Sequence, residues 1–494
     1  MLKRKLGTLF LLTSLLLTGI PTTLAAPTAP TVYVAGDGSG DFNCDGKDDH
    51  VQINEALKFV ADNPQYTTVY LKGPFTYVID STLLIGDNTI LEGDSDACIK
   101  LADEAGWKTL VPLIKNRDSA GNDNITIRGF EIDGNSEKQM SLGSSRLGRG
   151  YYNLMHFTKS SDITVENMYL HHGCGDGLKV ENVDNVNFVN NTVYQLGHDA
   201  LYCMYSNNIV AANNDIFTRT NSALRLTNSN NAKLHDNLIH SEYKLSSGSS
   251  TGPGIEIQKT NSYAMDDIEI YNNVLHTLNG AGIWMFGYDN DNVKRGQDVY
   301  IHHNIFKNVG QYWVDTGYSN AGIIISQFDN TRIENNIIDN GGHAGIKFWK
   351  YSSKYQMSET FTATVRNNII LNQDDHAAAG IWVQDTASGK YAIKSENNCF
   401  NNNTGGSYVG PGISQLDDIL SDPLFVDPSK NDYHLKSASG HWFENEWVFD
   451  NETSPLIDAG YSLSDYRNEP ESNGDRINIG RYGNTNEASR SISN

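Results

Sequence analysis

The sequence predicts an all-β fold, a right-handed parallel β-helix, and three observations lead to it. An Asn-Asn pair or a near equivalent recurs between apolar triplets, and its second member steps by 23, 23, 36, 31, 32, 32 and 30 residues. Short strands with alternating apolar residues, often introduced by Gly, precede most pairs. No helical stretch between the pairs is long enough for a βαβ crossover, so each repeat is expected to form one coil stacked in parallel on the last. The pairs are Asn190-Asn191, Asn213-Asn214, Asp236-Asn237, Asn272-Asn273, His303-Asn304, Asn335-Asn336, Asn367-Asn368 and Asn397-Asn398.

The recurring Asn is expected at a tight inner turn of each coil. There its amide can bond the same group one coil away, and Asn tolerates a left-handed backbone. The inward Leu, Ile and Val side chains fill a continuous core. No single coil can bury its apolar face alone, so the array is expected to fold as one elongated domain.

The two ends of the chain differ from the repeats. Residues 1–25 read as a signal peptide, with Lys3, Arg4 and Lys5 ahead of an apolar run and a small-residue cleavage site at Thr23-Leu24-Ala25. Residues 26–420 are expected to form the β-helix, plugged at its N-terminus by a helix over 51–60, and residues 421–494 a C-terminal capping segment. The protein is therefore expected to be secreted, extracellular or in a cell-surface matrix, without membrane insertion.

The charge of the chain restricts its partners. The formal net charge is −22, and removing three basic residues with the signal peptide makes it −25. Such a chain repels nucleic acid, and a site for an anionic polysaccharide must carry its own local positive charges. The five cysteines are widely spread without metal-type spacing, so no disulfide framework is indicated.

Aligning the coils on their strands places two outward columns on one face. These columns mix carboxylates, bases and aromatic rings, as a sugar-binding groove requires, because Arg and Lys pair with uronate carboxylates. The first column is His156, Lys179, Tyr202, Arg225, Glu256, Trp284, Ile324, Lys347 and Trp382, and the second is Thr158, Glu181, Met204, Thr227, Gln258, Phe286, Ser326, Trp349 and Gln384.

The acids of this groove are the catalytic candidates, with Asp199 and Glu256 as the pair and Asp176 in support. Adjacent coils lie ~4.8 Å apart, so Asp176 and Asp199 are expected to be neighbours, and Glu256 lies roughly 10 Å beyond Asp199. Two like charges so close raise one pKa, as a general acid needs. Carboxyl separations of ~5 Å and ~6.5–9.5 Å suit retaining and inverting hydrolysis, and both are available here. The alternative for each acid is a turn cap or a salt bridge to Arg225 or Lys179.

Other groove residues are expected to bind the substrate, and they leave two further functions open. A lyase would use a Tyr, Lys or His as the base at the carbon next to a uronate carboxylate, while Arg neutralises that carboxylate. A non-catalytic glycan-binding surface β-helix or adhesin is the third reading. Long inserts at 240–253, at 288–297 and around Trp313 and Asp315 are expected to wall the groove. The predicted substrate-binding residues are His156, Lys179, His198, Tyr202, Arg225, Gln258, Trp284 and Lys347.

An acidic segment before the N-terminal helix resembles half of a calcium loop. Asp41, Asn43 and Asp45, followed by Gly46, match its first positions. Position 12 is Gln52 and not Glu, so this is not an EF-hand. A structural Ca²⁺ is weighed against a plain acidic turn, and no cofactor is expected to be required.

Several segments together resemble the disaggregatase family of methanogenic archaea, over nearly the whole mature chain. The resemblance implies an extracellular enzyme that depolymerises methanochondroitin, a matrix glycan of uronate and N-acetylgalactosamine. No catalytic motif of the family is carried over, so the site residues rest on the groove argument. The segments are Tyr33-Val34-Ala35-Gly36-Asp37, Asn43-Cys44-Asp45-Gly46, Thr68-Val69-Tyr70-Leu71-Lys72-Gly73-Pro74, Asn88-Thr89-Ile90-Leu91-Glu92-Gly93-Asp94, His198-Asp199-Ala200 and the stretch from Asp475 to Asn484.

Overall fold

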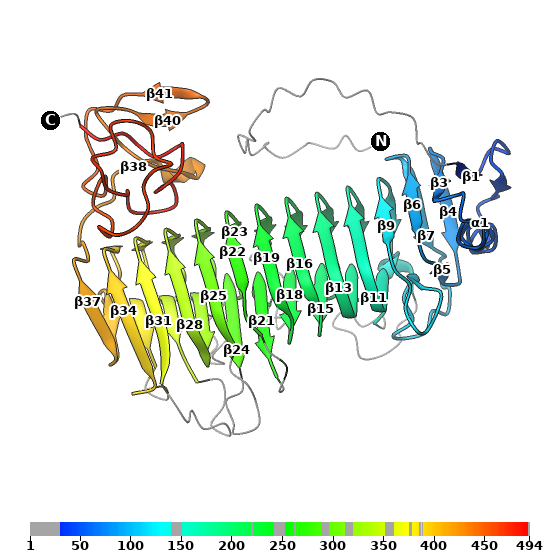
Figure 1. Ribbon diagram of the computed structural model, residues 1–494, viewed down its shortest axis with the longest axis horizontal. Coiled ribbons are helices and arrows are strands. Elements are labelled where there is room, and N and C mark those ends of the chain that lie inside the picture. The colour runs from blue at the N-terminus through cyan, green and yellow to red at the C-terminus, as the bar shows by residue number, and fades with distance from the viewer. Residues whose placement is uncertain are drawn as a thin grey trace.

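The computed structural model describes residues 30–139, 151–218, 221–241, 252–260, 263, 265–287, 296–311, 320–350, 360–374, 378–384, 387 and 389–492. These residues form an elongated stack of parallel strands, with the N-terminal coils at one end and the C-terminal segment at the other (Figure 1). The expected signal peptide lies outside the described residues. Among the described residues, no helix is long and apolar enough to cross a membrane.

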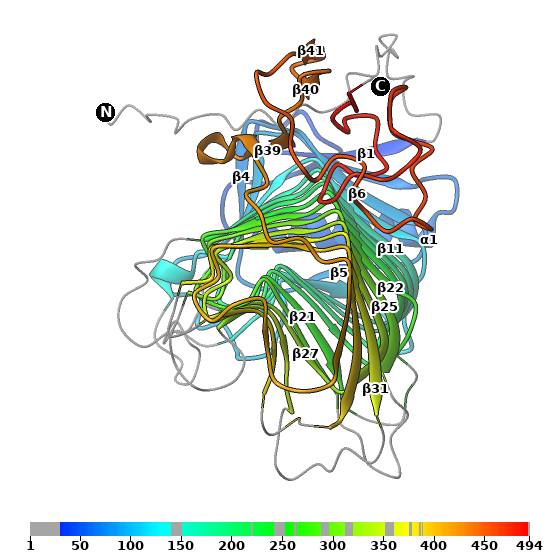
Figure 2. The same ribbon diagram turned by 90° about the vertical axis from the view of Figure 1, so that its left-hand side faces the viewer.

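Three columns of strands run along the stack, and the strands within each column pair in parallel. Figure 2, which looks along the stack, shows the coils superimposed. The first column carries the predicted groove. In two early coils, β11 (Met155–Glu166) and β13 (Leu178–Val189) run through the first and second columns as single strands. The first column continues with β15 (Leu201–Met204), β18 (Leu224–Thr227), β21 (Ile255–Lys259), β24 (Ile283–Gly287), β27 (Ala321–Ser326), β30 (Ala344–Phe348), β33 (Ala379–Val383) and β36 (Tyr408–Val409).

The strands of the second column follow the groove strands in the chain order. It holds β16 (Asn207–Ala212), β19 (Asn230–His235), β22 (Ile268–Tyr271), β25 (Gly296–His302), β28 (Phe328–Glu334), β31 (Phe361–Arg366), β34 (Tyr391–Glu396) and β37 (Ile413–Leu416). The first coils contribute β1 (Thr31–Ala35), β2 (Phe42–Asn43), β3 (Thr68–Leu71), β5 (Leu83–Ile85), β6 (Thr89–Gly93), β8 (Ile114–Asn116) and β9 (Ile125–Arg128) to these two columns.

The third column is a twelve-stranded parallel sheet. It is made of β4 (Phe75–Ile79), β7 (Ala97–Leu101), β10 (Glu131–Asp133), β12 (Tyr169–His171), β14 (Thr192–Tyr194), β17 (Asp215–Phe217), β20 (Leu238–His240), β23 (Val274–His276), β26 (Ile305–Lys307), β29 (Ile337–Asp339), β32 (Ile369–Leu371) and β35 (Cys399–Asn401).

The two members of each Asn pair have different structural roles. The first member takes the left-handed backbone, with φ of 57° at Asn190 and 54° at Asn367. The second member is buried and forms the ladder: Asn273 Nδ2 donates to Asn304 Oδ1 at 2.9 Å. The same bond joins every successive pair from Asn191 to Asn398, and the ladder ends on the carboxylate of Asp418. The predicted ladder is confirmed.

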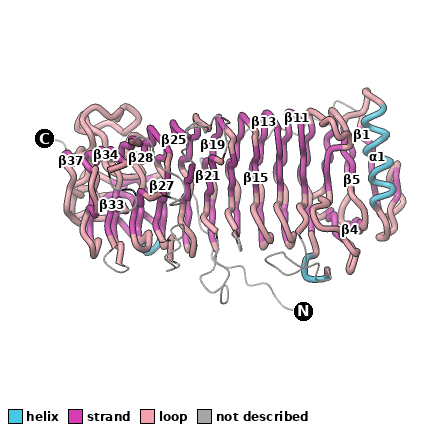
Figure 3. The backbone as a smooth tube through the Cα atoms, turned by 90° about the horizontal axis from the view of Figure 1, so that it is seen from below, coloured by secondary structure: helices cyan, strands magenta, loops and turns pink. Residues whose placement is uncertain are grey.

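The predicted N-terminal helix is present as α1 (His50–Asp62), which covers the end of the first coils (Figure 3). It buries Ile53, Ala56, Leu57 and Val60 against the core, and each large apolar side chain so buried contributes ~1.5–3 kcal/mol.

The C-terminal segment covers the last coils from the side. It contains the hairpins β38 (Phe425–Asp427) with β39 (Asp432–Leu435) and β40 (His441–Phe443) with β41 (Glu446–Val448). Its apolar side chains pack against outward residues of the third column, whose exposure would otherwise be costly. This cluster joins Ile305, Ile337, Ile369, Leu371 and Cys399 to Phe425, Tyr433, Leu435, Leu456 and Ile479.

Candidate active site

The strand register confirms the predicted groove column coil by coil. Lys179 lies opposite Tyr202, Tyr202 opposite Arg225, and Arg225 opposite Glu256. The column continues through Trp284, Ile324, Lys347 and Trp382. The constant repeat thus brings side chains far apart in sequence into adjacent positions on one face.

Asp176 and Asp199 lie at the start of consecutive groove strands, and His198 lies between their carboxylates. Both aspartates are fully buried. His198 Nδ1 is 2.6 Å from Asp176 Oδ1 and 3.2 Å from Asp199 Oδ2. One imidazole therefore pairs with two carboxylates.

Three polar residues that the sequence reasoning missed complete this arrangement. The Tyr151 hydroxyl donates to Asp176 Oδ2 at 2.7 Å. Asn221 Nδ2 donates to Asp199 Oδ1 at 2.8 Å and lies 3.0 Å from His198 Nε2. Ser222 Oγ donates to Glu256 Oε2 at 2.6 Å.

Two of these partners could have been predicted from the 23-residue spacing between successive coils. Ser222 lies 23 residues after Asp199, and Asn221 lies 23 after His198, so both occupy the equivalent positions of the next coil. Tyr151 has no such sequence signal, because only the chain path brings it to Asp176. Asp176 Oδ1 also accepts the backbone N–H of Asp199, so the turn-capping alternative holds for that atom.

Glu256 is the third buried acid, and Arg225 joins it to Asp199. Arg225 Nη2 lies 3.7 Å from Glu256 Oε1, and Nη1 lies 3.7 Å from Asp199 Oδ2. Gln258 donates to Glu256 Oε1 and accepts from Arg225 Nη2 at 2.9 Å. We call Asp176, Asp199 and Glu256, with His198 and Arg225, the acid cluster.

Basic and aromatic side chains adjoin the acid cluster on the groove face. The Tyr202 ring lies between two cations, with Lys179 Nζ at 5.3 Å and the Arg225 guanidinium carbon at 4.6 Å from its centroid. Lys179, Tyr202 and Arg225 are partly exposed, whereas the three acids are buried. A substrate therefore meets these cations and this ring first.

The pKa values of His198 and Asp176 differ from those expected for two neighbouring carboxylates of like charge. Burial alone would lower the pKa of His198, but the carboxylates of Asp199 and Asp176 outweigh it and raise that pKa to about 10. Burial would likewise raise the pKa of Asp176, but His198 and the Tyr151 hydroxyl hold it below its ordinary value. The expectation that one aspartate of the pair has its pKa raised by the other is wrong for Asp176, because a cation stands between the two.

Within the acid cluster, Glu256 is the acid with a raised pKa. Burial is the largest cause and the charge of Asp199 adds to it, while Arg225, Ser222 and Gln258 oppose the shift. A carboxyl group with a raised pKa is suited to donate a proton. His156, at the head of the column, is half-buried, and this partial burial, with the charges of Lys179 and Lys115, lowers its pKa to about 4.

The acid cluster also offers metal-ligand atoms. A carboxylate oxygen each from Asp176 and Asp199 and Nδ1 of His198 lie within 4.8 Å of one another. His198, with its raised pKa, and Arg225 already supply positive charge to these carboxylates. A cation there would have to displace the proton of His198.

In the later half of the column Trp284, Ile324 and Lys347 are buried, whereas Trp382 is partly exposed. Trp284 packs with Phe286 and Ile324 in an apolar cluster outside the core. Lys347 is fully buried, donates to Asn320 Oδ1 at 3.0 Å and lies 4.8 Å from the Trp382 ring centroid. In this arrangement Trp284 and Lys347 do not present an open binding face, and their role in substrate binding stays a prediction. The inserts expected to wall the groove fall largely outside the described residues.

The acidic segment before α1 uses its side chains within turns. Asp41 accepts the N–H of Tyr33 at 2.8 Å, and Asn43 that of Gly40 at 2.9 Å. Asp45 accepts the N–H of Lys47 at 3.1 Å. Calcium binding at Asp41, Asn43 and Asp45 stays a prediction.

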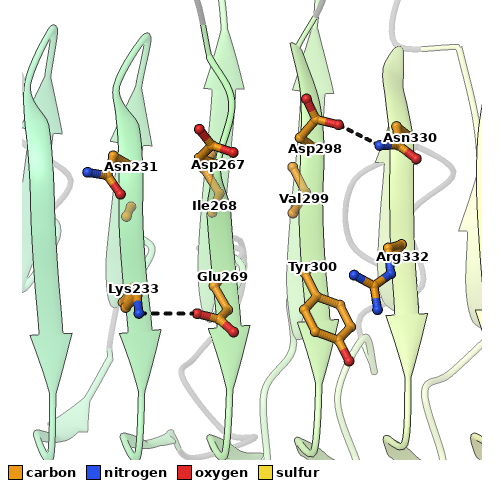
Figure 4. Close-up of a pocket in the computed structure, with 11 residues that line it drawn as sticks. Asn231, Lys233, Asp267, Ile268, Glu269, Asp298, Val299, Tyr300, Asn330 and Arg332 are labelled. Atoms are coloured by element: carbon orange, nitrogen blue, oxygen red, sulfur yellow. Dashed lines mark hydrogen bonds and ion pairs between the residues drawn. The ribbon is translucent and has the colours of Figure 1, made fainter. Parts of the chain in front are cut away.

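A hollow of about 390 Å³ lies elsewhere, on the outer face of the second column (Figure 4). Lys233 pairs with Glu269 at 3.7 Å, and the Arg332 guanidinium lies 4.0 Å from the Tyr300 ring centroid. Its acids include the partly exposed Glu269. Unlike the acid cluster, the described residues that line this hollow include no buried carboxylate.

Two family models match the chain. Residues 118–293 match the right handed beta helix region, which includes the acid cluster, so the predicted right-handed parallel β-helix is confirmed. Residues 265–460 match the model described as disaggregatase related. This match covers less than half of the chain, and over these residues the predicted resemblance to the disaggregatase family is confirmed.

Solved structures share the fold at low identity. A family 28 exopolygalacturonase of Yersinia enterocolitica is similar with a TM-score of 0.55 and 14% identity, over 79% of this chain and 78% of that one. A mannuronan C-5 epimerase A-module of Azotobacter vinelandii has a TM-score of 0.51 and 15% identity, over 76% and 96%. Both are polysaccharide-acting enzymes, and the likeness is one of fold. No curated protein matches the chain.

Proposed function

We propose that this protein is a secreted enzyme that hydrolyses a uronate-containing matrix polysaccharide within the chain. The observation that carries the proposal is the acid cluster, in which three buried carboxylates converge with His198 and Arg225 on the groove face. Burying charged groups is costly, and such clusters with perturbed pKa values gather at functional sites.

Glu256 is the general acid in this mechanism. Burial raises the pKa of Glu256, which favours the protonated form that donates to the leaving glycosidic oxygen. Asp199 is the second carboxylate, acting on water or on the sugar. Its Oδ2 accepts no hydrogen bond from the described residues and is held 3.2 Å from His198 Nδ1. Asp176 and Tyr151 position His198, and through it Asp199.

Arg225 and Lys179 supply the local positive charge that an anionic substrate needs on this acidic chain. A uronate carboxylate would compete with Asp199 and Glu256 for the Arg225 guanidinium, which lies 3.7 Å from each. Substrate binding would then loosen both ion pairs and open the acids. The resemblance to disaggregatases, which the match of residues 265–460 supports, leads us to propose a chondroitin-like glycan of uronate and N-acetylgalactosamine as the substrate class.

A uronate-specific lyase is the second candidate, and the exposure of the groove favours it. Tyr202 is partly exposed between two cations, whereas the acids are buried. Tyr202 would remove the proton next to the uronate carboxylate while Arg225 neutralises that carboxylate. The product would be unsaturated, with no water added.

Mass spectrometry of the products separates these functions. The purified protein is incubated with chondroitin-type glycans and extracted cell-matrix polymer, beside Asp199→Asn, Glu256→Gln and Tyr202→Phe. Glu269→Gln, a carboxylate change in the hollow, is the matched control and should remain active. Hydrolysis predicts products that each gain one water, lost in the first two variants. Unsaturated products lost only in Tyr202→Phe establish the lyase, and binding without cleavage leaves an adhesin.

A further inference from the structure

We propose that Asp133, His171 and His172 form a binding site for a divalent transition-metal cation such as Zn²⁺. The three residues lie on the outer face of the third column. One ligand atom of each, a carboxylate oxygen or an imidazole nitrogen, lies within 4.8 Å of the other two. The proposal is independent of the proposed function.

The coil geometry brings these ligands together. Asp133 ends β10 and His171 ends β12, and the two residues pair directly across the ladder. His172 has a left-handed backbone with φ of 49°, which returns its imidazole to the same side. The Nδ1 atoms of His171 and His172 are 2.5 Å apart, and His171 Nδ1 is 3.8 Å from Asp133 Oδ1.

The proton of His171 is placed so that Nδ1 can act as a ligand. His171 Nε2 lies 2.8 Å from Glu131 Oε1, and a carboxylate there can only accept. Nε2 therefore carries a hydrogen, and Nδ1 shares a hydrogen bond with Nδ1 of His172, so a bound cation would take the place of the proton between these two nitrogens. A carboxylate that orients a histidine in this way is the usual outer partner of a metal ligand.

The charges around the ligands favour a cation. Glu131 and Asp133 contribute two negative charges. Lys100 lies 3.3 Å from Asp133 Oδ2 and contributes one positive charge, which leaves a net negative charge at the site. Two imidazole nitrogens and one carboxylate oxygen suit Zn²⁺ and similar first-row cations, with a fourth position left for water.

A second histidine pair in the chain provides a matched control. His302 and His303 repeat the arrangement, with Nδ1 atoms 2.7 Å apart, His302 Nε2 3.1 Å from Glu269 Oε1, and φ of 56° at His303. Among the described residues this pair gains no third ligand. In addition, His303 Nε2 lies 2.9 Å from the Gly483 carbonyl oxygen.

The test uses the full secreted chain, stripped with a chelator and titrated with Co²⁺ by visible absorption and with Zn²⁺ by calorimetry. Asp133→Asn keeps the size of the side chain, and His172→Asn and His303→Asn place the same residue at left-handed positions. We expect wild type and His303→Asn to bind alike. Asp133→Asn and His172→Asn should bind at least about 100-fold more weakly, and Glu131→Gln about 10–100-fold more weakly.

Thermal unfolding supplies the second readout. Saturating Zn²⁺ should raise the unfolding temperature of wild type and of His303→Asn, but not that of Asp133→Asn. The proposal is overturned if wild type binds neither metal. It is equally overturned if Asp133→Asn and His172→Asn bind as wild type does, because the cation would then lie elsewhere, for instance at Asp176, His198 and Asp199.

Discussion

Replacing Asn273 by Ala tests whether the buried Asn ladder holds the coils together. Asn273 is fully buried in the middle of the ladder. Its Nδ2 donates to the Leu234 carbonyl oxygen at 2.8 Å and to Asn304 Oδ1 at 2.9 Å. Its Oδ1 accepts from the backbone N and from Nδ2 of Asn237 at 3.1 and 2.9 Å. The substitution therefore removes four hydrogen bonds and leaves their partners buried.

The expected loss follows from these four bonds. A buried hydrogen bond contributes about 1 kcal/mol net, so Asn273→Ala should lower the free energy of unfolding by about 4 kcal/mol. The control is Asn207→Ala, which removes the bonds to Asp184 and from Asn230 at the partly exposed outer surface. Water replaces these partners, so the control should cost less than about 1 kcal/mol.

Urea unfolding followed by circular dichroism measures both changes in the free energy of unfolding, provided that the variants have the same slope of free energy against urea concentration. A cost for Asn273→Ala below about 1 kcal/mol would refute the reasoning. So would an equal cost for Asn207→Ala, because burial would then not distinguish the hydrogen bonds of Asn273 from those of Asn207.

Two further predictions concern the acid cluster. The pKa of His198 is raised from 6.5 to about 10 in the folded protein, so its stabilisation is fully present below pH 6.5 and is lost as the pH rises through 10. The difference in urea midpoint between wild type and His198→Gln should therefore shrink between pH 6.5 and 10.5, and a constant difference would contradict the cationic His198. Ser222→Ala removes a hydrogen bond that lowers the pKa of Glu256, so that pKa should rise further. The alkaline limb of kcat/KM against pH should then move to higher pH, and an unmoved limb would show that Glu256 is not the titrating acid.

The sequence by itself determined the fold and the alignment of the groove. A repeat of nearly constant length forces equivalent residues into the same position of successive coils, so Lys179, Tyr202, Arg225 and Glu256 had to share one column. The same periodicity placed Asp176 and Asp199 side by side. Apolar alternation and the Asn pairs were sufficient because each coil contacts mainly its neighbours.

Only the tertiary structure decided what surrounds each of these side chains. His198 stands between the two aspartates, Tyr151 reaches Asp176, and Arg225 joins Asp199 to Glu256. These contacts turned the expected like-charge pair into an ion-paired cluster and left the raised pKa on Glu256.

The burial of outward column residues beyond Glu256 was equally invisible in the sequence. Lys347 is outward in the repeat but buried in the fold, and the isoleucines of the third column are outward but covered by the C-terminal segment. The repeat fixes the position of a residue along a coil. Burial and charge depend on contacts between distant parts of the chain, which no local pattern contains.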